Sequence, residues 1–503
     1  METHFDVTEW QPTKAPEPGE EDISSELPTL IATLNDQTRA IYRHPYDPNG
    51  WSCRAETLAR LRYPELAVGD TCKAIILCRT LLARLCEDRR YKLGYHMDFW
   101  MLDETESNDE EEDARRDDLE QRLVDLQADA HLLQNENLYH FPTFEEGRFL
   151  QRPYPWMEAK HRRRDDELLA EINDDFEEAE LKIVNNFPKE RPAGQVSKGR
   201  CCILKRHAFG EMDVGGNDSS ELLGVFAARD LAQETVIVID ETEAWGCIGP
   251  GKGGSTSNLS GGAGCSDPIH PNLPSDDVSQ DLRWIRERAG RYAAEVILRC
   301  RFLIGCIADD VAHPLDHTLI ARLTPTYRRE KVRLFGLEHD IAIPNDCLQQ
   351  FGIDIFSDSS YDTWVLFTLE ARVENNSWSD PLHSCISPLF SLFNHSCEPN
   401  VEKIHTIMVI RVTEDIKQGE QLFVDYDGFM KDQPLAARRK RMKKWLDADC
   451  QCTKCQRQEA EQQATDERCT CGCGGCKEPG IGLAEWDVAD KPVFPEDAWT
   501  VRK

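Results

Sequence analysis

The stretch SPLFSLFNHSCEPNV, residues 387–401, decides the fold of this chain. Its apolar beginning, from Leu389 to Phe393, predicts a segment that enters the protein interior. The residues that follow, Asn394 to Asn400, bring two amides, an imidazole, a thiol and a proline together. Buried polar groups are costly unless each finds a partner. Their density after an apolar run therefore indicates a functional site.

Length and charge restrict the classes of function. The chain has 503 residues, enough for two or more domains with separate cores. Lys and Arg number 59 against 91 Asp and Glu, which gives a formal net charge of -32. Binding to a nucleic-acid backbone depends on cationic side chains that neutralise phosphates. The balance therefore disfavours direct nucleic-acid contacts and favours basic partners, such as lysine-rich protein segments.

The sequence also gives expectations about location. It contains no apolar run of about 18 residues, and its N-terminus, METHFDVTEW, lacks a basic and then apolar signal pattern. We therefore expect no membrane span and an intracellular location, in the nucleus, the cytoplasm or both. In that reducing setting the 20 cysteines are expected to be thiols or metal ligands. The basic run at 438–444 is interpreted first as a solvated helix face and otherwise as a nuclear-localisation or partner-binding patch.

The N-terminal part has a helical pattern. Residues 1–50 are rich in Pro, Glu and Thr, and we expect them to be loosely ordered. Residues 51–195 are predicted to form a helical region with an acidic linker. One apolar stripe in this region has alternating spacings of four and three: Leu119, Leu123, Leu126, Ala130 and Leu133. Such a stripe packs against a helix of the same chain or forms a coiled coil between two chains, and its short length favours the first.

The pattern changes near Pro192 to short alternating apolar runs, which predict strands. We expect a strand-rich domain over residues 196–445, interrupted by a Gly/Ser-rich loop at 249–275 and a helical insertion at 281–370. Residues 446–503 are a cysteine-rich segment and tail. The predicted fold class is therefore α+β.

Three motifs together resemble the SET-domain protein-lysine methyltransferases. They are NHSCEPN at 394–400, GEQLFVDYD at 419–427 and CQCTKC at 450–455. The segment 221–237 is similar to the opening strand pair of that domain. The large insertion and the passage ARRKRMKKWLDADCQCTKC are most similar to the SET-and-MYND subgroup, although no paired cysteines indicate a MYND finger. The resemblance covers residues 200–456.

The resemblance implies a β-rich SET fold with knot-like threading of its C-terminal part. S-adenosylmethionine would bind on one side, and the substrate lysine would enter by a channel from the other. Tyr426 would be the catalytic tyrosine of this channel, and Trp378 is a candidate wall residue. The residues that the resemblance places at the cofactor are Asn394, His395, Ser391, Phe393 and Gly224.

The chemistry of methyl transfer agrees with these residue types. A lysine amine must be neutral to attack a methyl group, although its reference pKa is about 10.4. An apolar channel and a neighbouring sulfonium both disfavour the ammonium form. A tyrosine hydroxyl can then align the amine with the methyl carbon. The expected partner is accordingly a histone or non-histone protein that carries the lysine, for example on a basic tail.

Cysteines near the C-terminus suggest a structural zinc site. A C-x-C-x-x-C stretch and one distant cysteine supply four thiolates: Cys397, Cys450, Cys452 and Cys455. In SET-domain proteins of this type, the cysteine of the NHSC motif completes such a site. A zinc ion there would hold the C-terminal segment against the cofactor and the channel. A second set offers ligands for another zinc ion or for loose binding of a soft metal: Cys469, Cys471, Cys473 and Cys476.

Departures from the family pattern leave an alternative function open. Leu222 stands where the family has the first glycine of its opening motif. Leu446 and Ala448 stand where aromatic residues often precede the zinc cysteines. These changes favour a catalytically weak SET-like scaffold that binds protein partners. The intact Tyr426 and the Asn394–His395 pair favour an enzyme.

Overall fold

The computed structural model describes the chain in several stretches. They are residues 10, 13, 23–87, 109–139, 148–149, 151–162, 164–186, 200–207, 222–240, 244–247, 283–325, 333–379, 383–404, 408–428, 430–446 and 449–468. The chain divides into two compact units, Met1–Cys450 and Gln451–Lys503. Within the described stretches, no helix has the length and hydropathy needed to cross a membrane.

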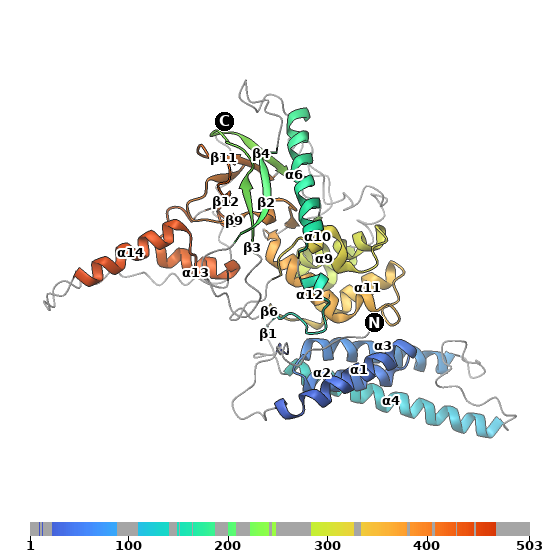
Figure 1. Ribbon diagram of the computed structural model, residues 1–503. Coiled ribbons are helices and arrows are strands. Elements are labelled where there is room, and N and C mark those ends of the chain that lie inside the picture. The colour runs from blue at the N-terminus through green and yellow to red at the C-terminus, as the bar shows by residue number, and fades with distance from the viewer. Residues whose placement is uncertain are drawn as a thin grey trace. The chain divides into compact units, whose positions relative to one another are not determined.

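Helices occupy most of the first unit, and its described strands, except β1, come after residue 200 in the sequence (Figure 1). The helices are α1 Leu27–Arg43, α2 Pro48–Arg60, α3 Pro64–Glu87, α4 Asp109–Tyr139, α5 Ala159–Arg162, α6 Asp166–Asn186, α8 Arg283–Ala289, α9 Ala293–Ala308, α10 Thr318–Ala321, α11 Ile343–Gln350, α12 Thr363–Asn376, α13 Leu435–Leu446 and, in the second unit, α14 Thr453–Arg468. The strands are β1 Arg148–Phe149, β2 Cys202–His207, β3 Leu222–Ala227, β4 Val236–Asp240, β5 Ala244–Cys247, β6 Arg333–Leu334, β7 Trp378–Ser379, β8 His383–Ile386, β9 Asn394–His395, β10 Val401–Ile404, β11 Met408–Val412 and β12 Phe423–Val424.

Helix α1 corrects one expectation from the sequence. A loosely ordered segment over residues 1–50 is wrong for residues 27–43, which form this helix. Its apolar residues recur at helical spacing, and they are buried against α2 and the first turns of α3: Leu27, Leu30, Ile31 and Leu34. The polar composition of the whole segment conceals this stripe, whose burial offsets the entropy cost of ordering the chain.

The leucine stripe of α4 packs within the chain. Leu119 and Leu123 are buried in one cluster with Leu81 and Leu85 of α3. Figure 1 shows α4 running alongside α3 among the N-terminal helices. The expectation that the stripe faces a helix of the same chain is confirmed.

A buried ionic cluster joins the N-terminal helices to α12. The guanidinium of Arg54 binds Asp70 through two nitrogens, at 2.7 and 2.8 Å, and reaches Asp362 at 3.0 Å. Lys73 donates to the same Asp362 carboxylate at 3.1 Å. Asp362 also caps the first turn of α12, where it accepts a hydrogen bond from the Thr363 amide. One carboxylate therefore fixes the start of α12 to two earlier helices.

The strands form several small sheets instead of one continuous sheet. β4, β11 and β10 make an antiparallel sheet, β2 pairs with β3, and β8 lies between β5 and β7. β1 pairs with β6, and the two-residue strands β9 and β12 run parallel to each other. The described part of the molecule thus combines helices with small sheets, as the α+β class requires.

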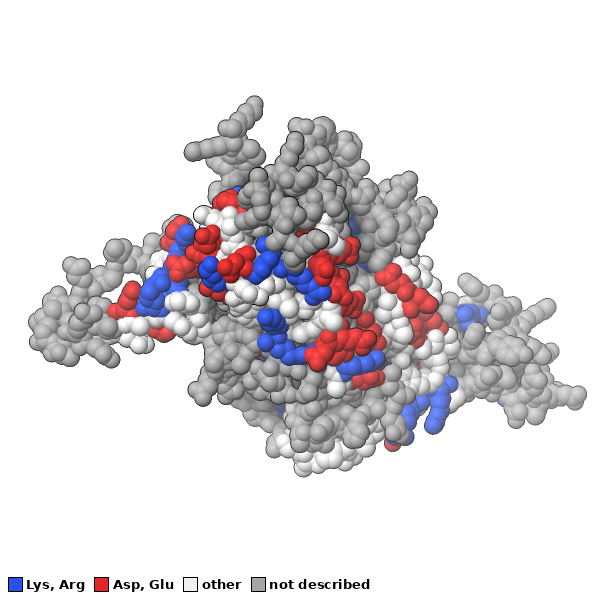
Figure 2. Space-filling model, turned by 45° about the horizontal axis from the view of Figure 1, so that its top comes forward, with Lys and Arg blue, Asp and Glu red and all other residues white. Residues whose placement is uncertain are grey.

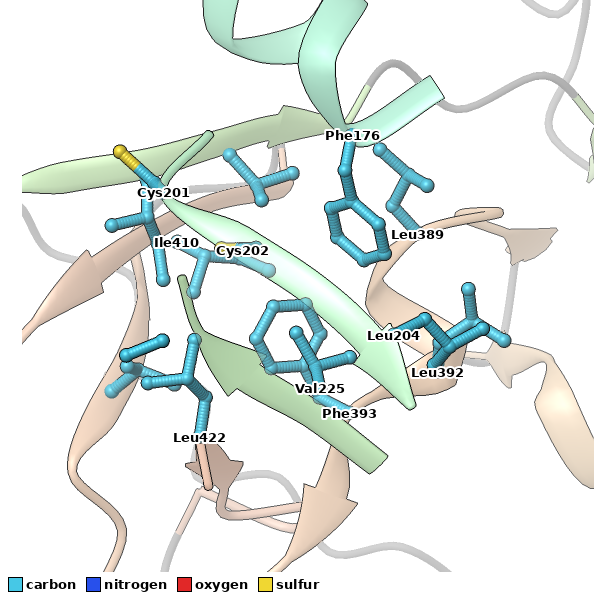
Figure 3. Close-up of a cluster of buried hydrophobic side chains, with 14 of the residues drawn as sticks. Phe176, Cys201, Cys202, Leu204, Val225, Leu389, Leu392, Phe393, Ile410 and Leu422 are labelled. Atoms are coloured by element: carbon cyan, nitrogen blue, oxygen red, sulfur yellow. The ribbon is translucent and has the colours of Figure 1, made fainter. Parts of the chain in front are cut away.

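Helix α6 covers the strands that lead to the site. Its apolar face is buried against residues of β2, β3 and β4: Leu169, Ile172, Phe176 and Ala179. Asn173, on the same helix, exchanges two hydrogen bonds with the backbone of Leu204, at 2.8 and 3.2 Å. Figure 3 shows Phe176 pointing into this core, where its ring meets that of Phe393 edge-on at 6.2 Å. The core therefore fixes the residue that directly precedes Asn394.

Candidate functional site

The entry to the site is held by an aspartate at the end of β4. The Asp240 carboxylate accepts hydrogen bonds from the backbone amides of Leu389 and Phe390, at 2.8 and 2.6 Å. Asp240 is buried, and it satisfies donors that the short 3-10 helix Phe390–Leu392 cannot satisfy itself. Asp240 was not predicted from the sequence as a site residue. Its only signal is a carboxylate that ends the otherwise apolar strand VIVID.

The NHSC segment lies beside the segment that carries the tyrosine. In the parallel pair, Asn394 faces Phe423 and His395 faces Val424. The Ser396 amide continues the ladder, with a 3.0 Å hydrogen bond to the Val424 carbonyl. The NHSC segment and the segment before Tyr426 are therefore in register.

Asn400 strengthens this pairing from the other end of the motif. Its amide nitrogen donates to the Gln421 carbonyl at 2.9 Å, and its amide oxygen accepts from the Phe423 amide at 2.8 Å. A side-chain amide can supply both a donor and an acceptor, as a strand backbone does. Asn400 belongs to the quoted motif, but no role for it was predicted.

Tyr426 is held at both ends. Its backbone amide donates to His395 Nδ1 at 3.3 Å, and its hydroxyl donates to the Phe393 carbonyl at 3.0 Å. The Trp445 ring, from α13, lies edge-on to the tyrosine with 6.4 Å between ring centroids. Burial raises the pKa of the Tyr426 hydroxyl well above its usual range. The group is therefore a neutral hydroxyl at physiological pH.

Several residues assigned to the cofactor converge on this pairing. The Asn394 side chain donates to the Leu223 carbonyl at 2.8 Å, directly before Gly224 in β3. The Leu422 amide donates to the Val225 carbonyl at 2.8 Å, which brings β3 next to the segment that precedes β12. The structure thus places Gly224 near Asn394, although more than 150 residues separate them.

Ser391 and Phe393 occupy different surroundings. The Ser391 hydroxyl donates to the Pro388 carbonyl at 3.1 Å within the same turn. The Phe393 side chain is fully buried in the hydrophobic core, as Figure 3 shows. What Phe393 offers at the site is its backbone carbonyl, the acceptor for Tyr426.

Other predicted positions lie partly or wholly outside the described residues. Trp378 begins β7, which pairs with β8, but its side chain lies outside the described part of the structure. Ala448 and the loop 249–275 also lie outside it, as does the second cysteine set: Cys469, Cys471, Cys473 and Cys476. The wall role of Trp378 and a second metal site stay predictions.

The first cysteine set forms a compact cluster. The ligand atoms of four cysteines lie within 4.8 Å of one another: Cys397, Cys450, Cys452 and Cys455. The Cys397 and Cys450 sulfurs are 3.9 Å apart. Tetrahedral zinc with Zn–S bonds of about 2.3 Å places its sulfurs about 3.8 Å apart. The spacing therefore fits a tetrahedral thiolate site and is too long for a disulfide bond.

His395 connects this cluster to the tyrosine. Because Nδ1 accepts from the Tyr426 amide, the proton of the neutral ring resides on Nε2. Nε2 lies 3.3 Å from the Cys397 sulfur, to which it can donate. The ring is buried between the two contacts. One imidazole therefore orients a potential metal ligand and the backbone of Tyr426 together.

Comparisons with known proteins agree with this arrangement. The family model of the SET domain matches residues 223–427. The chain is 34% identical over 105 residues to human "Protein-lysine N-methyltransferase SMYD4". This match covers 20% of this chain and 13% of that relative. It is 38% identical over 72 residues to "Potential protein lysine methyltransferase SET6" of Saccharomyces cerevisiae. That match covers 14% of this chain and 19% of that relative.

The chain thus spans less than a fifth of the length of these curated relatives, so the similarity concerns one part of each protein. That part agrees with the geometry: the matched range begins in β3 and ends directly after Tyr426. It includes the Asp240 anchor and the paired strands β9 and β12. Residues 223–427 therefore match the SET domain in both sequence and strand pairing.

Proposed function

We propose that this protein is a protein-lysine N-methyltransferase that uses S-adenosylmethionine. The observation that carries the proposal is the hydroxyl of the half-buried Tyr426, bound to the Phe393 carbonyl beside the parallel strands β9 and β12 in the segment that matches the SET domain. The names of the similar curated proteins support the same reaction. The proposed substrate is the lysine side chain of another protein.

The residues near β9 fit the proposed cofactor. Asn394 and Gly224 converge through the Leu223 carbonyl, so one ligand can contact both. We propose that His395 contributes its main chain, because its ring is already buried against Tyr426 and Cys397. When bound, S-adenosylmethionine supplies a methyl group on a positively charged sulfur. The protein supplies the position of that group and the exclusion of water.

Tyr426 is suited to orient the lysine amine. Its proton is donated to the Phe393 carbonyl, so the lone pairs of its oxygen are available as acceptors. An amine N–H can donate to that oxygen, which turns the nitrogen lone pair away from the tyrosine. Because burial keeps the hydroxyl neutral, it adds no negative charge that would stabilise the ammonium form. Orientation of this kind contributes several kcal/mol to well-aligned reactions, roughly 7 in favourable cases.

The proposal includes the threading and the zinc that the family resemblance implies. The parallel pairing of β9 with β12 supports a knot-like passage of one segment beside the other. The four clustered cysteines would hold a structural zinc ion, with all four positions taken by thiolates. Such an ion would stabilise the segment around Cys397 and, through His395, the backbone of Tyr426.

The charge of the chain supports a basic protein partner. The net charge of -32 favours a lysine-rich tail over a nucleic acid. Figure 2 shows acidic and basic side chains interspersed on one face, without a continuous basic surface in the described part of that view. We propose action in the nucleus or the cytoplasm, where lysine-rich protein tails are available.

A catalytically weak SET-like scaffold that binds protein partners is the second candidate. It is favoured by Leu222, which pairs with His207 in the strand where the family has a glycine. Glycine at such a position has no side chain, whereas leucine adds one. Such a protein would bind partners without binding the cofactor.

Calorimetric titration of the folded, zinc-replete protein with S-adenosylmethionine separates the two candidates. The enzyme binds the cofactor and transfers radiolabelled methyl groups to lysine-rich protein tails. The Tyr42→Phe variant, altered at a tyrosine of α1 outside the site, is expected to retain full transfer. Absence of cofactor binding would overturn the proposed methyltransferase function and favour the scaffold function.

A further inference from the structure

The helix after the catalytic segment holds the residue next to Tyr426. Arg441 of α13 forms an ion pair with the Asp427 carboxylate: Nη2 donates to Oδ1 at 2.7 Å, and Nε lies 2.6 Å from Oδ2. Asp427 directly follows Tyr426 in the sequence. Its side chain is only 9% exposed, whereas that of Arg441 is 57% exposed. A charge-assisted hydrogen bond with a second close approach of the same two groups restricts both their distance and their orientation.

The same helix also contacts the tyrosine ring. Trp445 lies four residues after Arg441, so both side chains are on one face of α13. The Trp445 ring meets Tyr426 at 68°, an edge-on arrangement that aromatic pairs favour. Two consecutive turns of α13 therefore contact two consecutive residues at the site.

A closed turn couples Asp427 to Tyr426. The Asp425 carboxylate accepts from the Asp427 amide at 3.1 Å and from the Met430 amide at 2.8 Å. Gly428 has φ of 73°, a backbone conformation that favours glycine. Because this turn is held internally, a movement of the Asp427 side chain is transmitted to the backbone of Tyr426.

These contacts change the interpretation of the basic run at 438–444. One solvated helix face accounts for Lys440, which is exposed. It does not account for Arg438, which is fully buried and donates to the Gln433 carbonyl, or for Arg441, which is ion-paired. The run therefore contributes to the structure around the site.

We propose that α13 positions the catalytic tyrosine, with Arg441 acting through Asp427 and Trp445 acting on the ring. This inference rests on the proposed methyl transfer and assigns Arg441 as a positioning residue. Without the Arg441–Asp427 contact, the tyrosine keeps its own hydrogen bonds to His395 and Phe393 but loses the constraint from α13. The hydroxyl then occupies a wider range of positions relative to the lysine amine.

Kinetics of three variants test this role. Arg441→Ala is expected to lower kcat by about 10- to 100-fold, since a small misplacement can cost about 100-fold. The affinity for S-adenosylmethionine and the melting temperature are expected to change little, because a half-exposed ion pair adds little to global stability. Arg441→Lys is expected to restore only part of kcat, because lysine keeps the charge but lacks the planar guanidinium that approaches both carboxylate oxygens. Lys440→Ala, the matched control, is expected to stay within about twofold of the wild type.

A double-mutant cycle distinguishes positioning from a general structural role. If Arg441 acts through the tyrosine hydroxyl, Arg441→Ala causes no further loss of kcat in a Tyr426→Phe background. Multiplicative losses from the two changes would overturn the inference, because they would show that Arg441 acts independently of that hydroxyl.

An observation without cofactor or substrate separates this inference from the proposed function. In protein labelled with ¹³C-tyrosine, the Tyr426 signal is assigned by its absence in Tyr426→Phe. Arg441→Ala is expected to shift this signal, and Lys440→Ala is not. A shifted signal in a protein without transferase activity would support the positioning contact and contradict the proposed methyltransferase function. An unshifted signal with unchanged kcat in an active enzyme would overturn the positioning role of Arg441.

Discussion

The hydroxyl of Tyr426 donates a hydrogen bond to the backbone carbonyl of Phe393, with 3.0 Å between the two oxygens. The Phe393 side chain is fully buried in the core beside Phe176 of α6. The acceptor carbonyl is therefore attached to a rigid part of the molecule. Because the tyrosine hydroxyl is bound to this rigid carbonyl, its own position is restricted. A group that orients a substrate requires such a fixed position.

Tyr426→Phe is expected to lower methyl transfer by about 100-fold or more, because the amine loses its acceptor. It is expected to leave the affinity for S-adenosylmethionine largely intact, because the cofactor contacts are assigned to other residues. Its cost in stability is expected to be about 1–3 kcal/mol, since the Phe393 carbonyl loses a hydrogen-bond donor. Radiometric transfer, calorimetry and urea unfolding measure the three quantities. Full transfer by this variant would exclude Tyr426 as the orienting residue.

Cys397→Ser is expected to remove one zinc equivalent per chain and to lower the melting temperature. Four thiolates must close around the ion to gain its binding free energy, which is about 10 kcal/mol in small zinc domains. Transfer activity is also expected to fall, because the His395 ring contacts both the Cys397 sulfur and the Tyr426 amide. Metal analysis by mass spectrometry and thermal unfolding check the result. Cys53→Ser, on α2 and outside the cluster, is the control. Equal zinc content in both variants would exclude Cys397 as a ligand.

Local periodicity was sufficient to predict some elements and misleading for others. The stripe from Leu119 to Leu133 predicted α4 because each turn repeats the same pattern. The polar composition of residues 1–50 suggested disorder, yet four apolar residues on one face are enough to order α1 against its neighbours. An average over a segment conceals a periodicity that occupies only part of it.

The site was predictable where a motif carries several of its residues. Asn394, His395 and Cys397 are close in sequence, and the resemblance related them to Tyr426. The bond from Asp240 to the Leu389 amide spans 149 positions, and that from Asn394 to Leu223 spans 171. Nothing local distinguishes Asp240 from a solvated carboxylate at a strand end. Hydrogen-bond partners this far apart in sequence can be identified only from the tertiary structure.

Asp362→Asn is expected to destabilise the protein by about 3–5 kcal/mol, because a buried ion-pair network loses one charge. Burial opposes ionisation of Asp362, but Arg54 and Lys73 hold its pKa well below the usual range. A depressed folded-state pKa contributes stability above about pH 4, and that stability is lost as the pH falls further. The variant is therefore expected to be less sensitive to acid than the wild type.

Urea unfolding at several pH values measures both effects. Asp36→Asn alters an exposed pair with Arg39 on α1 and is expected to cost less than about 1 kcal/mol. A loss of similar size in the two variants would show that the cluster between α2, α3 and α12 adds nothing beyond a surface pair.

Glu65→Gln is expected to flatten the dependence of stability on pH between about pH 4 and pH 7. Glu65 is fully buried, and burial raises its pKa to about 7, although hydrogen bonds from Thr13 and Tyr154 oppose the shift. The folded state therefore keeps a proton that the unfolded chain has already released. Stability is highest below the unfolded-state pKa, about 4.3, and is lost as the pH rises toward 7.

The size of the loss follows from the width of that interval. Each pKa unit corresponds to about 1.4 kcal/mol, so ionisation of Glu65 costs at most about 3–4 kcal/mol at pH 8. Glutamine carries no such penalty, and the stability of the variant relative to the wild type is expected to rise across this range. For Glu56→Gln, at an exposed position of α2, the curve of stability against pH is expected to run parallel to that of the wild type. If the curve of Glu65→Gln also runs parallel to that of the wild type, the buried carboxyl is not the group that titrates.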